Sequence, residues 1–386
     1  MLLQRLFTDV NTGGREQIVG SNSRHARYRD VIQWLSSEEE AQWDAFVMRH
    51  PLGVVYQLSA WKHVLEDAFP HIRGRFLVLR DSRTKEIKAG LPVYTVKSWL
   101  LGNRAVSVPF ASICDPLIST MEELNLLLAQ IHCAAKEVGA QKIELRSTKM
   151  QNECATSSLC ASASYKHHYL SLDKTADELF ATFAKSSVRQ KVNKAKRAGV
   201  IIEERDDEEG LRICHAILES TRRRLALPPI PYAFFQAMRR RLGTDHLNVY
   251  IAMHAGQAVA THLVLPFRDL WISEYTGNTN SAPHGVNQLL WWDTIQRAQA
   301  SDARWFSFGR TSSDNEGLLA YKRRWAPIEE DVVHFTNKAP NASLTNARVI
   351  KLPDFSTLYG ITKLLLRKAP TPVCRMIGNF CYRHLG

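Results

Sequence analysis

One strand-like stretch and the segment that follows it carry the residues best suited to acid–base chemistry. Glu274 and Tyr275 lie in LWISEYTGNT, and Tyr321 lies further along the chain. General acid–base catalysis needs a base that removes a proton from the attacking group and an acid that protonates the leaving group. Glu274 is a candidate for the base, and Tyr275 or Tyr321 for the acid. Two alternatives stay open: a sheet-surface Glu274 with a core Tyr275, or a reaction carried by positioning and oxyanion hydrogen bonds.

A short loop next to this stretch is a candidate phosphate site. Gly285, Val286 and Asn287 lie in NSAPHGVN, which leads into the helix-like segment QLLWWDTIQRAQA. Free N–H groups and the helix dipole at such a junction favour an anion. The alternative is an ordinary loop in which Asn287 caps the helix. The loop therefore predicts binding of a carrier molecule with phosphates.

Three cations form a second candidate set for substrate binding. Lys322 and Arg323 directly follow Tyr321, and Arg310 ends the segment RWFSFGR. Arginine offers a planar fork and lysine a point charge to a diphosphate or a phosphorylated carrier. The alternatives are a solvated basic turn for Lys322 and Arg323, and a plain salt bridge for Arg310.

The order of strand-like and helix-like segments predicts the elements that position these residues. Residues 246–325 predict the strands LNVYIAM, AVATHLVLPF and LWISEYTGNT, then a helix, then the strand RWFSFGR. An earlier stretch repeats this order with RFLVLRD, IKAGLPVYTVKS, RAVSVPF, the helix EELNLLLAQIHCAAKEV and QKIELRS. The repeat predicts a duplicated α/β unit, with domains at 28–172 and 173–338.

A basic segment joins the two predicted units. Apolar residues recur at helical spacing from Thr175 to Gly199, which predicts one long helix. Its second half is rich in lysine and arginine and has no acidic residue. Arg189 and Lys196 are candidates for holding a phosphate-bearing substrate. The alternative is a solvated face, neutralised by the acidic run Glu203–Glu209.

The composition is that of a globular protein with room for two domains. The chain has 386 residues, of which 45% are hydrophobic and 23% charged, and such values are ordinary for folded domains. A net charge of +12 favours nucleic acid, anionic lipid or phosphate-bearing substrates as partners. We expect residues 1–27 to be a flexible tail. The basic extension 339–386 could pack on the body or rest on an anionic membrane.

Missing motifs argue against several classes of protein. Seven scattered cysteines without a C-x-x-C pair disfavour a disulfide framework and a zinc site, so no metal is expected. Without G-x-S-x-G, P-loop or G-x-G-x-x-G motifs, serine hydrolases, P-loop NTPases and dinucleotide oxidoreductases are disfavoured. No run approaches the ~18 apolar residues that span a bilayer, and the start is too polar for a signal peptide. We expect a cytoplasmic protein, with peripheral membrane contact as the alternative.

Four segments, in this order, carry a resemblance to a known family: VVYQLSAWKHVLEDAF, SSVRQKVNKAKRAGV, HGVNQLLWWDTIQRAQ and FSFGRTSSDNEGLLAYKRRWAP. They resemble the Fem-type, FemAB-like branch of the GNAT acyltransferase superfamily, near its exopolysaccharide-associated members. The resemblance implies an α/β fold of two tandem GNAT-like domains, each a mixed, mostly antiparallel sheet flanked by helices. It also implies an active cleft in the second domain, a first domain without catalysis, and a functional role for Lys322.

The resemblance further implies the reaction. An acyl or aminoacyl group would move from acyl-CoA or aminoacyl-tRNA to an amine or hydroxyl of a cell-envelope or exopolysaccharide precursor. Three departures bear on this: the loop has only Gly285, Ser307 replaces a family aspartate, and Asp302 replaces a glycine. The poor loop puts acetyl-CoA use in doubt. The alternative is a GNAT-like protein without catalysis that binds nucleic acid or an acidic polymer.

Overall fold

The computed structural model describes residues 30–325, 327–337 and 369–384. The first half of the chain forms β1 (Val31–Trp34), α2 (Glu40–Arg49), α3 (Ser59–Ala68), β2 (Ile72–Arg80), β3 (Ile87–Val96), β4 (Arg104–Val106), α4 (Met121–Glu137), β5 (Lys142–Ser147), α5 (Gln151–Thr156) and β6 (Leu159–Ser171). The second half forms α6 (Ala176–Thr182), α7 (Gln190–Arg197), β7 (Ile201–Glu204), α8 (Glu208–Arg224), α9 (Tyr232–Leu242), β8 (Asn248–His254), β9 (Gln257–Phe267), β10 (Leu270–Asn278), α10 (Val286–Ala300), β11 (Trp305–Ser312), α11 (Glu316–Arg323), β12 (Ile328–Asn337) and α13 (Thr371–Tyr382).

Local sequence signals explain where many of these elements begin and end. Thr120 begins α4 with a capping box, in which its hydroxyl accepts from the Glu123 N–H and the Glu123 carboxylate accepts from the Thr120 N–H. Lys85 has a φ of 63° in the turn between β2 and β3, the left-handed conformation that a tight turn requires. The strands and helices predicted between residues 72 and 147 and between 248 and 312 are confirmed.

Both halves repeat one order of strands, as the sequence predicts. β2, β3 and β4 are antiparallel neighbours, and β5 returns parallel to β4 after α4. β8, β9 and β10 are likewise antiparallel, and β11 returns parallel to β10 after α10. The mixed, mostly antiparallel sheet flanked by helices is therefore confirmed, and so is the repeated unit.

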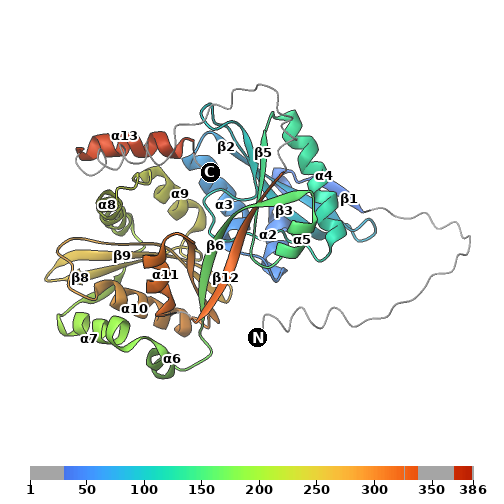
Figure 1. Ribbon diagram of the computed structural model, residues 1–386. Coiled ribbons are helices and arrows are strands. Elements are labelled where there is room, and N and C mark those ends of the chain that lie inside the picture. The colour runs from blue at the N-terminus through green and yellow to red at the C-terminus, as the bar shows by residue number, and fades with distance from the viewer. Residues whose placement is uncertain (1–29, 326, 338–368, 385–386) are drawn as a thin grey trace, which may run out of the picture.

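The last strand of each half joins the two units into one sheet. Among the described residues the order is β1-β2-β3-β4-β5-β12-β6-β11-β10-β9-β8-β7. β12, from the second half, pairs with β5, while β6, from the first half, pairs with β11. Figure 1 shows β6 and β12 crossing between the halves. Because these strands are exchanged, the boundaries proposed at residues 172 and 338 stay predictions.

The predicted single helix from Thr175 to Gly199 is wrong. The segment breaks into α6 and a second helical stretch, which consists of a π-helical turn at Lys185–Arg189 followed by α7. Phe183 has an extended backbone between α6 and the π-helical turn. Phe183 is buried against Trp292 and Trp325, at ring distances of 5.6 and 5.1 Å. The Ala184 N–H donates to the Arg324 carbonyl instead of continuing the helix. Tertiary packing therefore overrides the helical pattern at this point.

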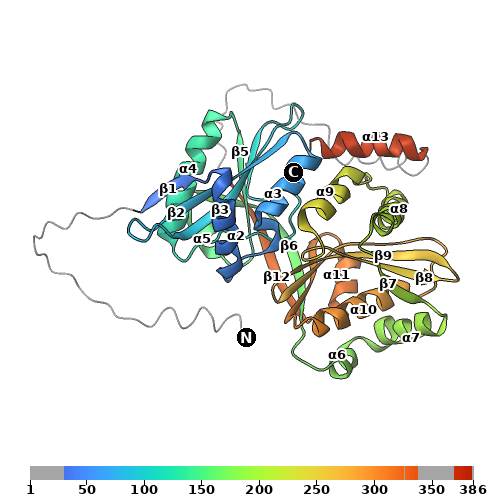
Figure 2. The same ribbon diagram turned by 180° about the vertical axis from the view of Figure 1, so that it is seen from behind.

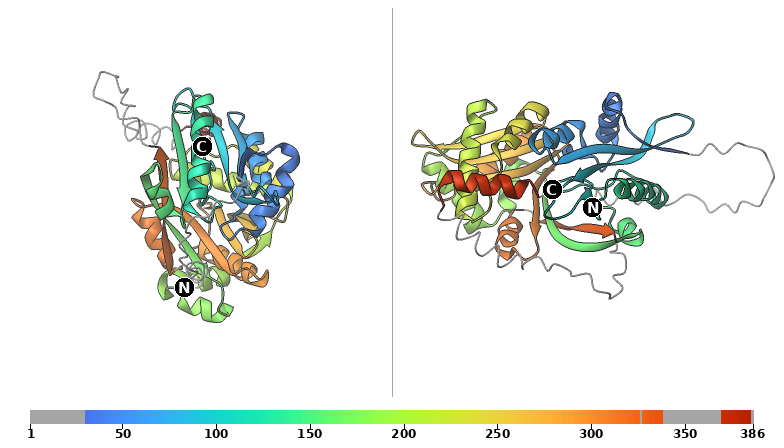
Figure 3. Two further views of the ribbon diagram at one scale, coloured as in Figure 1. Left: turned by 90° about the vertical axis from the view of Figure 1, so that its right-hand side faces the viewer. Right: turned by 90° about the horizontal axis from the view of Figure 1, so that it is seen from above.

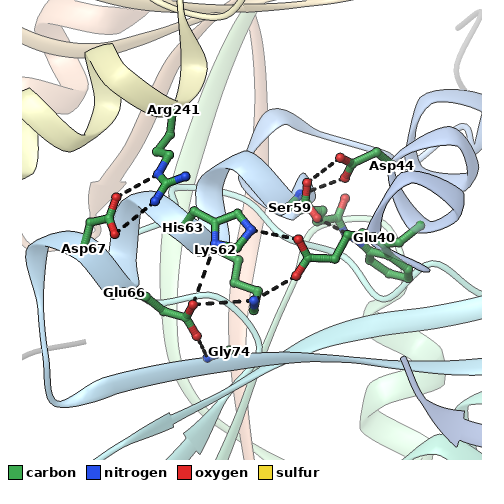
Figure 4. A network of polar contacts seen from close by, with 11 residues as sticks. Glu40, Asp44, Ser59, Lys62, His63, Glu66, Asp67, Gly74 and Arg241 are labelled. Carbon is green, nitrogen blue, oxygen red and sulfur yellow. Dashed lines mark hydrogen bonds and ion pairs between the residues drawn. The ribbon is translucent and has the colours of Figure 1, made fainter. Parts of the chain in front are cut away.

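Helices of the two halves also pack against each other beside the sheet. The rings of Trp61 in α3 and Phe234 in α9 are 5.9 Å apart and edge-on. Asp67 at the end of α3 forms ion pairs with Arg240 (2.7 Å) and Arg241 (2.8 Å) of α9. Figure 4 shows the Asp67–Arg241 pair beside the network of Glu40. These contacts fix the first half against the face of the second half that carries α8 and α9.

The C-terminal helix α13 packs on the body, which is one of the two arrangements expected for this basic end. Cys374 and Tyr382 are buried, and Arg375 pairs with Glu219 of α8 at 2.7 Å. α13 lies along the outside of α8 and α9, as the two opposite views show (Figures 1 and 2). The predicted tail 1–27 and residues 339–368 lie outside the described residues. In the part of the chain that is described, no helix is long and apolar enough to cross a membrane.

Candidate active site

A gap between two parallel strands is the centre of the candidate site. β10 and β11 pair only over Leu270–Ile272 and Trp305–Ser307, although both strands continue further. Beyond Ile272 and Ser307 the two strands no longer pair with each other. Gly309 has a φ of 67° there, which suits glycine. The pairing of β10 with β11 therefore ends two residues before Glu274.

A β-bulge at Glu274 aims two side chains to one face of the sheet. In the pairing of β10 with β9, Ser273 lies opposite Val264 and Tyr275 opposite Leu263, so Glu274 is the extra residue. Consecutive residues of a strand normally alternate between faces. Here Tyr275 packs on Phe235 of α9, at a ring distance of 5.7 Å. Glu274 also turns toward the first half of the chain.

Glu274 meets a tyrosine of the first half. The Tyr56 hydroxyl donates a hydrogen bond to Glu274 Oε2, and it lies 3.0 Å from Ser112 Oγ. Burial raises the pKa of Glu274 to about 7, against the lowering effect of hydrogen bonds from Tyr56 and Tyr275 and the charge of Arg310. A carboxyl group with this pKa is partly ionised near neutral pH and can accept a proton.

Arg310 lies on the other side of the gap, on β11. Its Nη1 is 2.6 Å from His334 Nε2, and its guanidinium stacks over the Tyr165 ring at 4.6 Å. Burial is the largest cause that lowers the pKa of His334 to about 3, so this imidazole is neutral and accepts the Arg310 hydrogen bond. Burial also lowers the pKa of Arg310 to about 10, which leaves the guanidinium charged at neutral pH.

Lys322 binds the backbone of β11 close to the gap. Its side chain is buried, and Nζ donates to the Gly309 carbonyl at 2.8 Å. Burial lowers the pKa of this amine to about 7. Lys322 therefore fixes the backbone of β11 where the strands separate, and its contacts are with that backbone.

Ser307, at the last paired position of β11, bonds a buried histidine. His167 Nε2 is 2.7 Å from Ser307 Oγ, which also accepts from the Gly309 N–H at 3.1 Å. Burial lowers the pKa of His167 to about 3. Ser307 thus ties β11 to β6 and to Gly309 with neutral groups.

A cavity between the two halves approaches this site. It has a volume of about 490 Å³, and its lining includes Val54, Ile113, His167 and Arg304. Val54 and Ile113 are close in the chain to Tyr56 and Ser112. Lys149 also lines the cavity and forms an ion pair with Glu330. The cavity therefore offers a mostly apolar space with charged groups at its wall, and His167 on that wall is bonded to Ser307 of β11.

The comparisons with known proteins agree with this geometry. Residues 183–323 match the family model described as the acetyltransferase (GNAT) domain. The chain carries a GNAT domain. The matched region contains β10, α10, β11 and Lys322, and its similarity to the GNAT domain supports a transferase.

Solved structures show the same fold over most of the chain. FemX has a TM-score of 0.61 at 16% identity, covering 78% of this chain and 96% of its own. The C-terminal domain of a putative lysylphosphatidylglycerol synthetase from Agrobacterium fabrum has a TM-score of 0.51 at 13% identity, covering 86% and 96%. A tandem GNAT protein from the clavulanic acid biosynthesis pathway has a TM-score of 0.52 at 12% identity, covering 79% and 98%. No curated protein sequence matches the chain significantly.

In the GNAT domain, the predicted phosphate loop is packed under the basic helix. Gly285 has a φ of 95°, and a Cβ atom there would lie 2.2 Å from the carbonyl oxygen of Lys191 in α7. The Val286 N–H donates to the Pro283 carbonyl, and the Asn287 amide donates to Asn278. α7 thus covers one side of the helix end, and one of the backbone N–H groups predicted to bind an anion, that of Val286, has a partner within the protein.

The basic side of α7 faces outward from the GNAT domain. Lys194, Lys196 and Arg197 are exposed and have no acidic partner among the described residues. The acidic run does not neutralise them: Glu203 pairs with Arg205 and Glu204 with Arg297. The Nε atom of Arg189 is buried without a hydrogen-bond partner in the described part. The alternative of mutual neutralisation therefore fails for these residues.

The structure gathers only part of the predicted site. Glu274, Tyr275 and Arg310 lie together, whereas Tyr321 packs on Trp291 of α10 at 5.3 Å, within the other hydrophobic cluster. Arg323 is exposed and pairs with Glu329 at 2.7 Å. Sequence reasoning missed Tyr56, Ser112 and His334. Tyr56 does lie in the segment VVYQLSAWKHVLEDAF, whose resemblance to the family is the available signal.

Proposed function

We propose that the protein transfers an acyl or aminoacyl group to an amine at the gap between β10 and β11, with Glu274 as the general base. The observation that carries this proposal is the bulge, which places a carboxyl group with a pKa of about 7 beside the open strand edges. A base with a pKa near the working pH combines a useful ionised fraction with a useful proton affinity. Direct attack needs no covalent intermediate on the protein.

The proton movements follow from the pair of neighbouring side chains. The acceptor amine attacks the carbonyl carbon of the donor in its neutral form, and Glu274 takes the proton that the nitrogen loses as the bond forms. The C–N bond forms, and the C–S bond of a thioester or the C–O bond of an ester breaks. Burial raises the pKa of Tyr275 well above its usual value, so its hydroxyl stays protonated and can donate to the leaving group. Glu274, which hydrogen-bonds Tyr275, returns the proton it removed.

Two faces of the sheet supply two approaches to the gap. The 490 Å³ cavity is lined by residues of both halves, and Tyr56 of the first half contacts Glu274. α7, α10 and Tyr321 belong to the other hydrophobic cluster. We assign the acceptor to the cavity side, with Arg310 binding a carboxylate or phosphate of that acceptor. An acceptor from cell-envelope or exopolysaccharide synthesis is the class that the Fem-type resemblance favours.

The donor approaches from the side of α7, and aminoacyl-tRNA fits this side better than acyl-CoA. The backbone of Lys191 lies against Gly285, where a pyrophosphate loop would need open N–H groups. The exposed cations Lys194, Lys196 and Arg197 suit a long polyanion. Arg189, with its unpartnered Nε atom, lies at the start of the same segment.

Calorimetric titration with acetyl-CoA and with aminoacyl-tRNA separates the donors. We expect saturable binding of tRNA whose affinity falls steeply with salt, and loss of about one unit of salt slope for each cation removed. The variant Lys194→Glu/Lys196→Glu tests the site. Arg83→Glu/Lys85→Glu, which reverses the same charge on the β2–β3 turn, is the matched control. Tight binding of acetyl-CoA, with the same affinity in both variants as in the unaltered protein, would reject tRNA as the donor. A bulky substitution such as Gly285→Trp cannot be used to block a donor site at the loop, because the new side chain would collide with Lys191 and disturb the fold.

A binding function without catalysis is the second candidate, favoured by the same exposed cations of α7. A substitution of Glu274 distinguishes the two functions. Glu274→Gln should lower turnover about 10²- to 10⁴-fold and leave tRNA affinity unchanged if the protein is a transferase that uses this base. RNA binding without turnover of any acyl or aminoacyl donor in the unaltered protein would favour the binding function.

A further inference from the structure

The C-terminal helix α13 has one face that packs on the body and an opposite face that is exposed. Cys374, Gly378 and Tyr382 recur every four residues and pack on the body, and a Cβ atom at Gly378 would lie 2.4 Å from the Pro229 carbonyl oxygen. On the opposite side, Met376 and Phe380 are 70% and 51% exposed. Viewed from above, α13 lies along the outer surface of the molecule (Figure 3). A short helix that is apolar on its outer side needs an explanation.

A loop of the first half extends this apolar surface. Trp99, between β3 and β4, is 77% exposed, and its ring lies 6.4 Å from that of Phe380. The loop is held to the end of α13, because Ser98 Oγ lies 2.9 Å from His384 Nδ1 and Arg104 donates to the His384 carbonyl. Elements from the two ends of the chain therefore build one fixed surface.

A cationic cavity lies beside it. Its volume is about 780 Å³, and its lining includes Lys97, Trp99, Asn379 and Arg383. No acidic residue is among the described residues that line it. Lys97 and Arg383 are exposed and have no ion-pair partner in the described part of the chain. Two such cations and an amide donor fit a phosphate group.

We propose that the α13 surface, defined as Trp99, Met376 and Phe380 with Lys97 and Arg383, docks on a bilayer that contains anionic phospholipid. The three apolar side chains enter the interface, where tryptophan is favoured, and the cavity receives a lipid headgroup phosphate. Charge complementarity selects this occupant: the apolar surface is bordered by uncompensated positive charge, as anionic lipid requires. A soluble protein partner with a matching acidic groove is not needed to explain either feature.

The docked helix lies close to the catalytic face. Tyr382, on its buried side, stacks on Phe69 at 6.1 Å and accepts a hydrogen bond from Arg222. Its hydroxyl also raises the pKa of Tyr275, after burial and Glu274. Membrane docking at α13 would therefore hold the gap near the bilayer. The proposal does not depend on the transfer reaction, since vesicle binding needs no donor.

Co-sedimentation of the full chain with vesicles tests the proposal. We expect binding to phosphatidylcholine vesicles that contain phosphatidylglycerol, weak binding to phosphatidylcholine alone, and loss of binding at high salt. Met376→Ser/Phe380→Ser should weaken partitioning roughly tenfold or more, because two apolar side chains stay in water. Lys97→Glu/Arg383→Glu should weaken it at least about tenfold on the anionic vesicles.

Two controls decide whether the surface itself is responsible. Arg83→Glu/Lys85→Glu carries the same change of charge elsewhere, and Ile201→Ser removes an exposed apolar residue of β7. Both should bind vesicles like the unaltered protein. Equal losses in the controls, or no vesicle binding by the unaltered protein, would overturn the proposal. Sedimentation velocity that shows a dimer lost in Met376→Ser/Phe380→Ser would also overturn it and assign the surface to a second copy.

Discussion

Tyr56 and Glu274, 218 residues apart in the chain, share a hydrogen bond in which the phenol donates to the carboxylate. The bond joins the two halves at the point where β10 and β11 separate. It stabilises the ionised form of Glu274 and so opposes the burial that raises its pKa. The first half therefore takes part in tuning the base of the second, although the resemblance implies a first domain without catalysis.

Tyr56→Phe should shift the pH dependence of transfer to higher pH. Loss of the hydrogen bond removes a lowering effect, so the pKa of Glu274 rises above about 7. We expect the acid-side midpoint of kcat/KM to move up by roughly half to one unit. A pH–rate profile measures this. Tyr232→Phe, which removes a hydroxyl bonded to Glu208 on α9, is the control; an equal shift there would remove the special role of Tyr56.

Glu274→Gln should lower the transfer rate about 10²- to 10⁴-fold, because the amide cannot accept the proton of the acceptor. The measurement is single-turnover transfer with saturating donor. An unchanged rate would show that positioning alone drives the reaction.

The same variant should be more stable than the unaltered protein in alkaline solution. The folded pKa of Glu274, about 7, exceeds that of the unfolded chain. Its contribution to stability is therefore full below the unfolded pKa and is lost as the pH rises through about 7. We expect Glu274→Gln to gain on the order of 2 kcal/mol relative to the unaltered protein above that pH and nothing at low pH. Urea unfolding at two pH values checks the sign, and a gain only at low pH would contradict it.

Arg310→Lys should impair acceptor binding more than chemistry. Lysine keeps the charge but loses the planar fork that contacts His334 Nε2 and stacks on Tyr165. We expect KM for the acceptor to rise roughly tenfold, with a smaller change in kcat. Steady-state kinetics with varied acceptor provides the test, with Arg49→Lys on the surface of α2 as the comparison. A fall in kcat alone would place Arg310 in the chemical step.

Gly285→Ala should destabilise the GNAT domain more than Gly199→Ala. Both glycines have positive φ, 95° and 76°, but a Cβ atom meets the Lys191 carbonyl at 2.2 Å only at Gly285. We expect a cost of about 1 kcal/mol at Gly199 and roughly 2 to 4 kcal/mol at Gly285. Chemical denaturation of the two variants measures the difference. Equal costs would mean that α7 does not rest on this helix end in solution.

Ser307→Ala should loosen the gap. The hydroxyl bonds both His167 Nε2 and the Gly309 N–H, so its removal leaves two buried polar groups without this partner. We expect a loss of about 1 to 3 kcal/mol in the free energy of unfolding. Hydrogen exchange at Gly309 should rise in parallel. Ser307→Thr, which keeps the hydroxyl, should retain most of the stability; a loss as large as that of alanine would point to crowding.

The sequence by itself determined the elements and their repeated order. Apolar strands such as Gln257–Phe267, the capping box at Thr120 and the turn at Lys85 are local signals, set by residues within a few positions of one another. Glu274, Tyr275 and Arg310 could be chosen as candidates because they follow from chemical type and from the order of those elements. The GNAT resemblance arose in the same way, from segments in order.

Only the tertiary structure decided which of these residues meet. A bulge turns Glu274 to the face of Tyr275, the exchange of β6 and β12 brings His334 to Arg310, and packing around Phe183 breaks the long helix. Tyr275 and Tyr321 look equally suited as the acid in sequence, yet they pack against different hydrophobic clusters. Each of these outcomes depends on contacts between residues far apart in the chain, whose free energies no local pattern contains.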